Sequence, residues 1–280
     1  MKIKFLVSAC LILGSSAQMA VADEGSSALE LPNYSDILNC AETSTQNTSQ
    51  VNQPDYCLAA SPFYWYENDP HWSGFVVGGQ SNLYSEVKAH IVTPVDRSVT
   101  CGDSYWGAWV GIGGYHTESL IQAGITNNPQ VAGEYIFFIE YLNHDNQNLA
   151  IYVPSQSFKA GVNLLISVSF NQTTGRAMFY LMDYSTGKSY TRTTNGDVSS
   201  YYDGSSAEWI NEKNGPTYFN FGTFNWTQAQ VRLLNGTWVD FGSQPGHGIQ
   251  VTNSNGDLLS SPQFFPITSS SFSDKFYQCF

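Results

Sequence analysis

From about residue 71 to its end, the chain carries short runs of alternating apolar and polar positions, the pattern that β-strands produce. The clearest run covers residues 134–141, in which Glu134, Ile136, Phe138 and Glu140 share one face of an extended segment. No stretch keeps a helical period over three turns. Aromatic and β-branched runs predict strands at residues 72–77, 135–142, 164–170, 177–184, 218–224 and 230–234.

Glycine-containing turn signals separate these runs. Thr-Gly or Asn-Gly pairs begin at residues 174, 186, 195, 214, 235 and 255. Roughly two hundred residues of short strands with frequent turns favour an all-β sandwich of two antiparallel sheets over any helical class. We expect this sandwich to form one domain over residues 67–280, with an N-terminal extension before it.

Two segments with other compositions precede the predicted domain. Residues 1–22 have a basic start, a short apolar core and Ala20-Val21-Ala22 before Asp23, which is typical of a secretory signal. Residues 23–66 are rich in Ser, Thr, Asn and Gln and contain no Lys or Arg. A pro-segment that shields an acidic domain is expected to be basic, so we favour an ordered extension. The protein is therefore expected to be secreted, either extracellular or periplasmic.

The charge balance narrows the set of partners. The chain has 11 Lys and Arg against 23 Asp and Glu, a formal charge of −12. Removal of a signal that holds two lysines leaves 9 against 23, or −14. Such a charge repels nucleic acid and anionic lipid, so we expect neither nucleic-acid nor membrane partners. The few basic groups favour stability at low pH.

The number and spacing of the cysteines favour disulfide bonds over a metal site. One of five lies in the predicted signal, and an even number in an exported chain favours pairing. Closeness in sequence predicts Cys40–Cys57, which leaves Cys101–Cys279. No Cys-x-x-Cys occurs and the histidines lack metal-ligand spacing, so we expect neither a metal nor a cofactor.

Residues 106–124, WGAWVGIGGYHTESLIQAG, are the strongest candidate for a site. They read as strand, tight turn and strand, and the second strand carries one amide, Gln122, among apolar neighbours. A polar side chain in such a place needs a partner, which a substrate can supply. The candidate carboxylates on other strands are Glu140, Glu208 and Glu212. An inward-facing Glu is suited to acid–base chemistry, whereas the alternative places these groups on a solvated outer face.

Four motifs occur in order along the chain: HWSG at residues 71–74, WVGIGG at 109–114, LIQAG at 120–124 and AEWINE at 207–212. Together they resemble the glutamic peptidases, the eqolisin family. The resemblance runs from about Trp72 to the C-terminus and includes the aromatic strand around Glu140. It implies a curved, concanavalin-like β-sandwich and a secreted acid endopeptidase that acts on polypeptides, and we expect a monomer.

The resemblance implies that Gln122 and Glu212 form the catalytic pair, flanked by Trp72, Trp109 and Glu140 as substrate-binding residues. Ionised Glu212 would activate a water and then return the proton to the leaving nitrogen, while the Gln122 amide would stabilise the oxyanion.

The sequence departs from the family pattern at two acids. Gly113 and Thr126 stand where the family has carboxylates, and this is expected to alter the pKa of Glu212 and the substrate subsites.

Two other functions stay open from the residues. A glycosidase would use Glu140 and Glu212 as its carboxylate pair, about 5–9.5 Å apart. A non-catalytic module would present tryptophans to sugar or peptide. A peptidase needs Gln122 directed toward Glu212, whereas a glycosidase needs a second carboxylate opposite the first. A binding module would bury Gln122 or Glu212 in ordinary sheet contacts with no open groove.

Overall fold

The computed structural model describes residues 66–78, 83–95, 101, 105–128, 130–143, 148–263 and 270–279. The predicted signal (1–22), nearly all of the predicted extension (23–66), Cys40 and Cys57 lie outside these residues. The described part consists of sixteen strands and two short 3₁₀ helices, η1 (Ser199–Tyr201) and η2 (Phe241–Ser243), with no α-helix. The prediction of an all-β fold is confirmed.

The strands form one hydrogen-bonded path that folds into two layers. The front layer has the order β14-β2-β11-β4-β5-β6-β7, and the back layer has the order β10-β9-β8-β3-β12. The front strands are β2 (Trp72–Gly78), β4 (Trp106–Gly113), β5 (Leu120–Asn127), β6 (Glu134–Leu142), β7 (Asn148–Lys159), β11 (Ser206–Lys213) and β14 (Gly246–Thr252). The back strands are β3 (Tyr84–Val92), β8 (Asn163–Asn171), β9 (Arg176–Asp183), β10 (Lys188–Thr193) and β12 (Thr223–Leu233).

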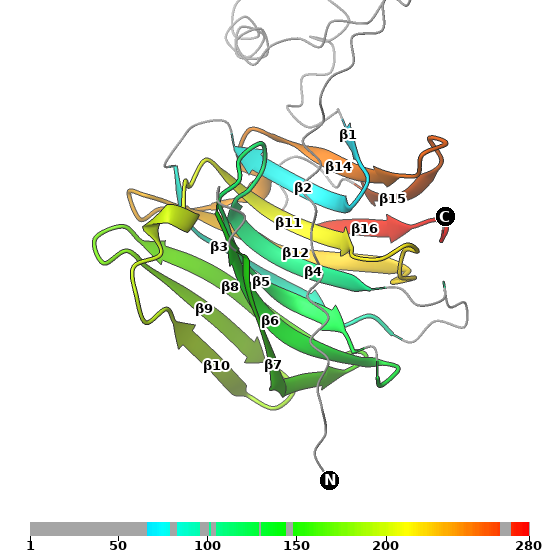
Figure 1. Ribbon diagram of the computed structural model, residues 1–280, viewed down its shortest axis with the longest axis horizontal. Helices are drawn as coiled ribbons and strands as arrows, with labels where there is room; N and C mark the ends of the chain where they lie inside the picture. The colour runs from blue at the N-terminus through cyan, green and yellow to red at the C-terminus, as the bar shows by residue number, and fades with distance from the viewer. Residues whose placement is uncertain are drawn as a thin grey trace, which may run out of the picture. The chain divides into compact units, whose positions relative to one another are not determined.

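Two strands join the layers, β15 (Leu258–Gln263) and β16 (Phe272–Phe276), so the sandwich is continuous along one side. Strands β3 and β8 pack against β4 and β5 although they are distant in the hydrogen-bonded path (Figure 1). The short β13 (Trp238–Asp240) pairs with β12. The two sheets of the expected sandwich are therefore one sheet bent over itself.

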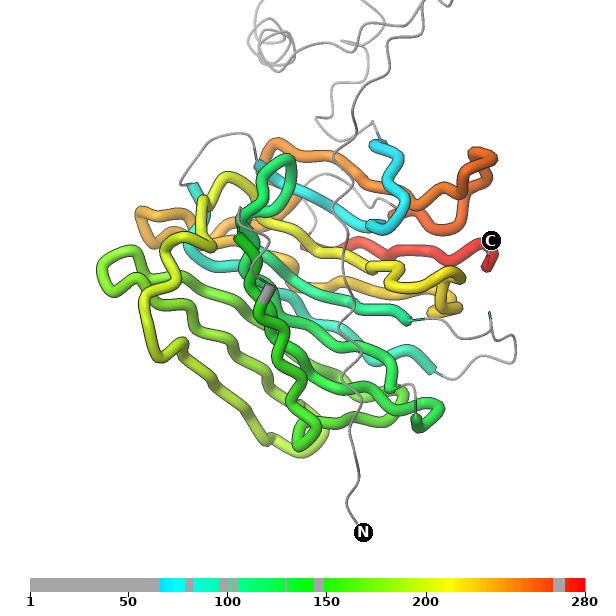
Figure 2. Tube along the Cα trace, in the orientation of Figure 1, coloured from blue at the N-terminus to red at the C-terminus, as the bar shows by residue number. Residues whose placement is uncertain are grey.

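The N-terminal strand β1 (Tyr66–Asp69) pairs in parallel with β14, whereas the other described pairings are antiparallel. Figure 2 shows the cyan β2 beside the orange β14, which brings the two ends of the domain together. The Asp69 carboxylate accepts hydrogen bonds from the backbone amides of His71 and Trp72, which fixes the turn that leads into β2. The chain therefore enters the front layer at Trp72 in a defined position.

Aromatic and β-branched side chains from the facing sides of the two layers fill the main core. Because neighbouring residues of a strand point to opposite sides, each front strand also presents an outer face. A second, smaller apolar cluster covers that outer face, formed by Val76, Trp109, Leu120, Phe138, Ile210 and Ile249. The middle of the front layer is thus buried on both sides.

One predicted strand is wrong in its position. Residues 218–222 are irregular, and β12 begins only at Thr223. The aromatic run predicts a strand, but its rings pack individually: Tyr218 and Phe221 are fully buried, and Phe219 stacks on Trp106. The conformation of this segment is therefore set by core packing around Trp106 and not by the β propensity of its residues.

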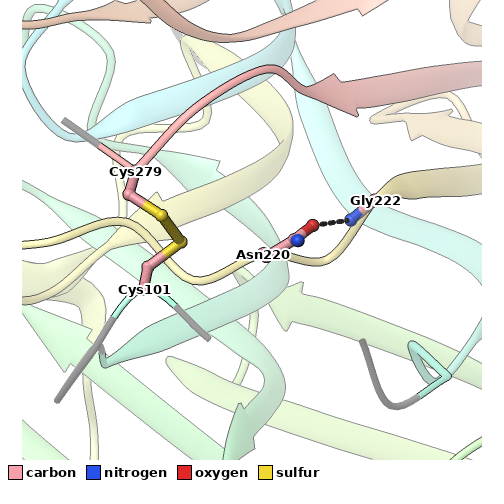
Figure 3. Close-up of a disulfide and its surroundings, with 4 residues drawn as sticks. All are labelled: Cys101, Asn220, Gly222 and Cys279. Carbon is pink, nitrogen blue, oxygen red and sulfur yellow. Dashed lines mark hydrogen bonds between the residues drawn. A yellow bond between two sulfur atoms is a disulfide. The ribbon is translucent and has the colours of Figure 1, made fainter. Parts of the chain in front are cut away.

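The predicted disulfide Cys101–Cys279 is confirmed (Figure 3). Its Cα atoms are 5.3 Å apart, within the usual range. Nearby, the backbone amide of Gly222 donates a hydrogen bond to the Asn220 side chain (Figure 3). The bridge ties the C-terminal end, beyond β16, to the segment before β4.

Candidate active site

Strand register places three of the candidate polar residues in one row on the outer face. Gln122 lies opposite Glu140 on one side and opposite Gly111 on the other, and Gly111 lies opposite Glu208. Opposite residues of antiparallel strands point to the same side of the sheet. The row therefore runs across β6, β5, β4 and β11 beneath the smaller apolar cluster.

The Gln122 amide is buried and already engaged. Its Nε2 donates a hydrogen bond of 2.7 Å to Oε2 of Glu140, and the two side chains are 3% and 9% exposed. A carboxylate oxygen only accepts, so Glu140 holds the NH2 end of Gln122 toward itself. The Oε1 of Gln122 has no hydrogen-bond partner among the described residues. The second amide hydrogen stays available to another acceptor.

Glu212 lies on the same outer face, toward the end of β11, and is partly exposed. Its Oε2 accepts a hydrogen bond of 2.9 Å from Nε1 of Trp109, whose ring meets Trp72 edge-on at 5.0 Å. Burial raises the pKa of Glu212, while hydrogen bonds from Trp109, Trp72 and Asn214 oppose that rise. The group is thus an acid that takes up a proton more readily than usual.

Glycines on β4 and β5 make room for Trp109. Gly124 lies opposite Trp109, and a Cβ at Gly124 would stand 2.2 Å from the Ala108 carbonyl oxygen and 2.6 Å from the Trp109 Cβ. The far edge of the indole leans over Gly111, with Cζ3 2.9 Å from where a Cβ would stand. One indole therefore reaches from Glu212 to the strand position that pairs with Gln122.

No hydrogen bond joins Gln122 to Glu212 in the described part of the chain. They lie on strands separated by β4, and they oppose Gly111 and Gly107 of that strand, four residues apart. Both glycines lack a side chain over the intervening sheet. The structure therefore places the expected pair on one face with a glycine strand between them, and brings Gln122 closest to Glu140.

The five expected site residues gather on this face, in two groups. Trp72 and Trp109 surround Glu212, and Glu140 binds Gln122. Residue patterns missed Asn214, which follows β11 and favours the ionised form of Glu212. A glycine-adjacent Asn after a strand reads as a turn, so no sequence signal marked it.

The alternative of solvated outer-face charges is wrong for two of the glutamates. Glu140 is buried, and Glu208 is 0% exposed. Alternation predicted correctly that Glu208 and Glu212 share a face, but it could not show that Leu120 and Trp109 cover that face at Glu208.

The two positions that depart from the family pattern have different surroundings. A Cβ at Gly113 would stand 2.9 Å from Oδ1 of Asp203, a carboxylate from the loop before β11, and φ at Gly113 is +79°. Asp203 thus occupies space beside the glycine. Thr126 donates a hydrogen bond of 2.8 Å to the Trp106 carbonyl, so its hydroxyl completes the sheet locally.

Within the described ranges, no group of three or more His, Cys, Asp or Glu side chains is arranged to hold a metal ion. Nor does any helix in those ranges have the length and apolarity needed to span a membrane.

Comparison with known proteins gives a family and a fold. The model of the peptidase A4 family matches residues 70–273. A crystal structure of scytalido-glutamic peptidase with a peptide-based transition-state analogue is 19% identical, covers 75% of this chain and 99% of its own, and has a TM-score of 0.58. The eqolisin SCP-B, solved in a complex with the tripeptide Ala-Ile-His, is 19% identical over the same shares with a TM-score of 0.57.

No curated protein sequence matches the chain. The solved structures show the same fold, and the family model covers well over half of the sequence. The peptidase expectation is thereby favoured over the glycosidase and the binding module. The chain belongs to the peptidase A4 family and is a glutamic-type peptidase.

Proposed function

We propose that the protein is a secreted endopeptidase that works at acid pH, with Glu212 as general base and acid and Gln122 as the donor to the oxyanion. The observation that carries the proposal is the shared outer face. Glu212 is partly exposed at one end, the Gln122 amide is held at the other, and Trp109 spans the glycine strand between them. Gly107 and Gly111 of β4 contribute no side chain between the two groups.

The chemistry assigns one role to each group. Ionised Glu212 takes a proton from a water as the oxygen of that water attacks the scissile carbonyl carbon, and then delivers the proton to the leaving nitrogen. The indole N–H of Trp109 holds the carboxylate in place, and Trp72 packs edge-on against the Trp109 ring. The amide hydrogen of Gln122 that does not bind Glu140 donates to the oxyanion, a role that a neutral group can fill over a broad pH range.

Glu140 supports this arrangement by holding the amide in one orientation. If the amide turned over, its oxygen would face the Glu140 carboxylate, and the two acceptors would repel each other. Glu140 and the two tryptophans are therefore proposed as residues that flank the bound polypeptide. The secretory signal at residues 1–22 and the disulfide support export, and a monomer without nucleic-acid or membrane partners remains our expectation.

The experiment is cleavage of a denatured protein across acid pH by the wild type and by Glu212→Gln and Gln122→Ala. Loss of one oxyanion donor is expected to lower kcat by about 10²–10³-fold, and loss of Glu212 by at least as much. The matched control is Glu134→Gln, which changes a glutamate that pairs with Lys159 at 2.9 Å. Pepstatin excludes a contaminating aspartic peptidase. Undiminished cleavage by Glu212→Gln would overturn the proposal.

A further inference from the structure

Glu208 is a buried acid to which the proposed chemistry gives no role. It is 0% exposed, and neither carboxyl oxygen has a hydrogen-bond partner among the described residues. Buried carboxyl groups are normally paired or hydrogen-bonded. A group that breaks this rule beside a candidate active site calls for an explanation.

Its position connects it with Trp109. Oε2 of Glu208 lies 3.3 Å from the point where a Cβ on Gly111 would stand, and Cζ3 of Trp109 lies 2.9 Å from the same point. The methyl carbon Cδ1 of Leu120 completes the packing there, also at 2.9 Å. At its other end the same indole donates to Glu212. A change in the volume or hydration of Glu208 therefore acts on a ring that holds Glu212.

The surroundings keep Glu208 neutral at acid pH. Burial raises its pKa well above the ordinary range, and the Asp203 charge raises it further, whereas Ser206 and the backbone of Tyr115 favour the ionised form. The neighbouring strand β14 contributes His247, which lies opposite Val76 in the same row as Glu208. His247 lies 3.5 Å from the Glu67 carboxylate of β1, and His116 lies 3.8 Å from the same carboxylate. Glu140 lies beyond Gln122 on the far side.

We propose that Glu208 is a positioning residue for Glu212 that acts through Trp109: as a neutral acid it packs beside the indole, and on ionisation it displaces the ring and releases Glu212. The inference rests on the proposed function. Because no hydrogen bond of ordinary geometry from the described residues reaches either oxygen of Glu208, ionisation favours the entry of water. The space over Gly111 is filled by Trp109 and Leu120. Admission of water there requires Trp109 or Leu120 to move, because an atom of each stands 2.9 Å from the Cβ position of Gly111.

Activity should then have two limits on the pH scale. Cleavage rises with pH as Glu212 ionises, because only its carboxylate can accept a proton from water. Cleavage falls at higher pH as Glu208 ionises and Trp109 moves. The falling limb belongs to a group that does not touch the substrate.

The test is the pH profile of kcat/KM for two variants that push the falling limb in opposite directions. Glu208→Gln keeps the shape and stays neutral, so its falling limb should move to higher pH by about one unit or more. Asp203→Asn removes a neighbouring negative charge and makes ionisation of Glu208 easier, so its limb should move to lower pH. Asp274→Asn, which neutralises the buried carboxyl on the other side of the layer, should leave the limb in place.

A purely structural role for Glu208 would lower activity equally at every pH and would not give opposite shifts. The proposal would be overturned if the falling limb of the pH profile stayed in place in both Glu208→Gln and Asp203→Asn. A shift of this limb in the same direction in both variants would overturn it as well. If Glu208→Gln does not fold, the Asp203→Asn shift alone decides.

Two readouts without catalysis separate this inference from the proposed function. Infrared spectra of folded wild type at acid pH should show the C=O band of a protonated carboxyl without hydrogen bonds, which Asp203→Asn should lose at lower pH than the wild type. Near-ultraviolet circular dichroism should change as the wild type ionises and stay constant in Glu208→Gln. Absence of both signals defeats the inference even if Glu212 proves catalytic, and inactivity of the wild type defeats only the function.

Discussion

Two fully buried carboxyl groups lie on opposite sides of the front layer, and their surroundings differ. Asp274, on the core side, accepts hydrogen bonds from Ser73, Asn211 and Ser260 at 2.7, 2.9 and 3.1 Å. Glu208, on the outer side, has neither oxygen satisfied. The core side uses its polar group to join strands, whereas the outer side leaves polar atoms free to respond to a ligand or a proton.

The same contrast holds for side-chain volume. The core face of β4 carries Trp106, Ala108, Val110 and Ile112, all fully buried. Its outer face carries glycine at every described position except Trp109, and Gly124 of β5 lies opposite that ring. The core face of β4 is stabilised by side chains that fill the space between the layers. On the outer face, glycines leave the backbone without side chains, so that large rings and carboxyl groups can lie over it.

The most disruptive change expected on the outer face is Gly124→Ala. The new Cβ would stand 2.2 Å from a backbone oxygen, so the sheet or Trp109 must move, at a cost of about 3 kcal/mol in the free energy of unfolding. Urea denaturation measures it. Gly196→Ala is the control, because no heavy atom lies within 4 Å of its Cβ position, and a change below about 0.5 kcal/mol is expected. Equal losses in both variants would contradict the contrast between the faces.

An effect of similar size is expected on the core side, and it depends on pH. Burial raises the pKa of Asp274 from 3.8 to about 6, against the hydrogen bonds from Ser73, Asn211 and Ser260. The folded state therefore prefers the protonated acid. Its contribution to stability is fully present below pH 3.8 and is lost as pH rises through about 6, a loss on the order of 3 kcal/mol.

Thermal denaturation at a series of pH values checks this expectation. The wild type should lose stability between about pH 4 and 7, and Asp274→Asn should flatten that loss. The exposed Asp257→Asn should keep the wild-type slope. A wild type that gains stability over the same interval would show that Asp274 does not control it.

The smallest effects are expected where the outer face meets β1. Glu67 accepts a hydrogen bond from the Tyr115 hydroxyl and lies 3.5 Å from His247 and 3.8 Å from His116. The hydrogen bond with His247 lowers the pKa of Glu67, so this stabilisation is present above pH 4.5 and is lost as pH falls further. Because His116 is 69% exposed, His116→Gln should change the free energy of unfolding by less than about 0.5 kcal/mol.

Glu67→Gln should cost more than His116→Gln, because it also replaces the charged acceptor of the Tyr115 hydroxyl with a neutral and weaker one. Melting temperatures at one mildly acidic pH are sufficient for the comparison. The reverse order would mean that exposed charge at this edge matters more than the buried contact.

The local sequence pattern predicts the strands better than it predicts which side chains of different strands come into contact. The alternation in residues 134–141 was sufficient to put Glu140 on one face of β6, and turn glycines such as Gly175 and Gly236 adopt the positive φ that their role requires. The bond between Gln122 and Glu140 depends on the register of two strands, which no single run of residues specifies. The burial of Glu208 depends further on which rings lie above it.

The bridge between Cys101 and Cys279 has a consequence for a protein that digests other chains. The ring it closes contains Gln122, Glu140, Glu208 and Glu212. One internal nick between the two cysteines would leave the fragments covalently joined, so a single self-inflicted cut cannot part the halves of the site. Autolysis has to make two cuts between the cysteines before any piece of that segment escapes, and reducing conditions should remove that protection.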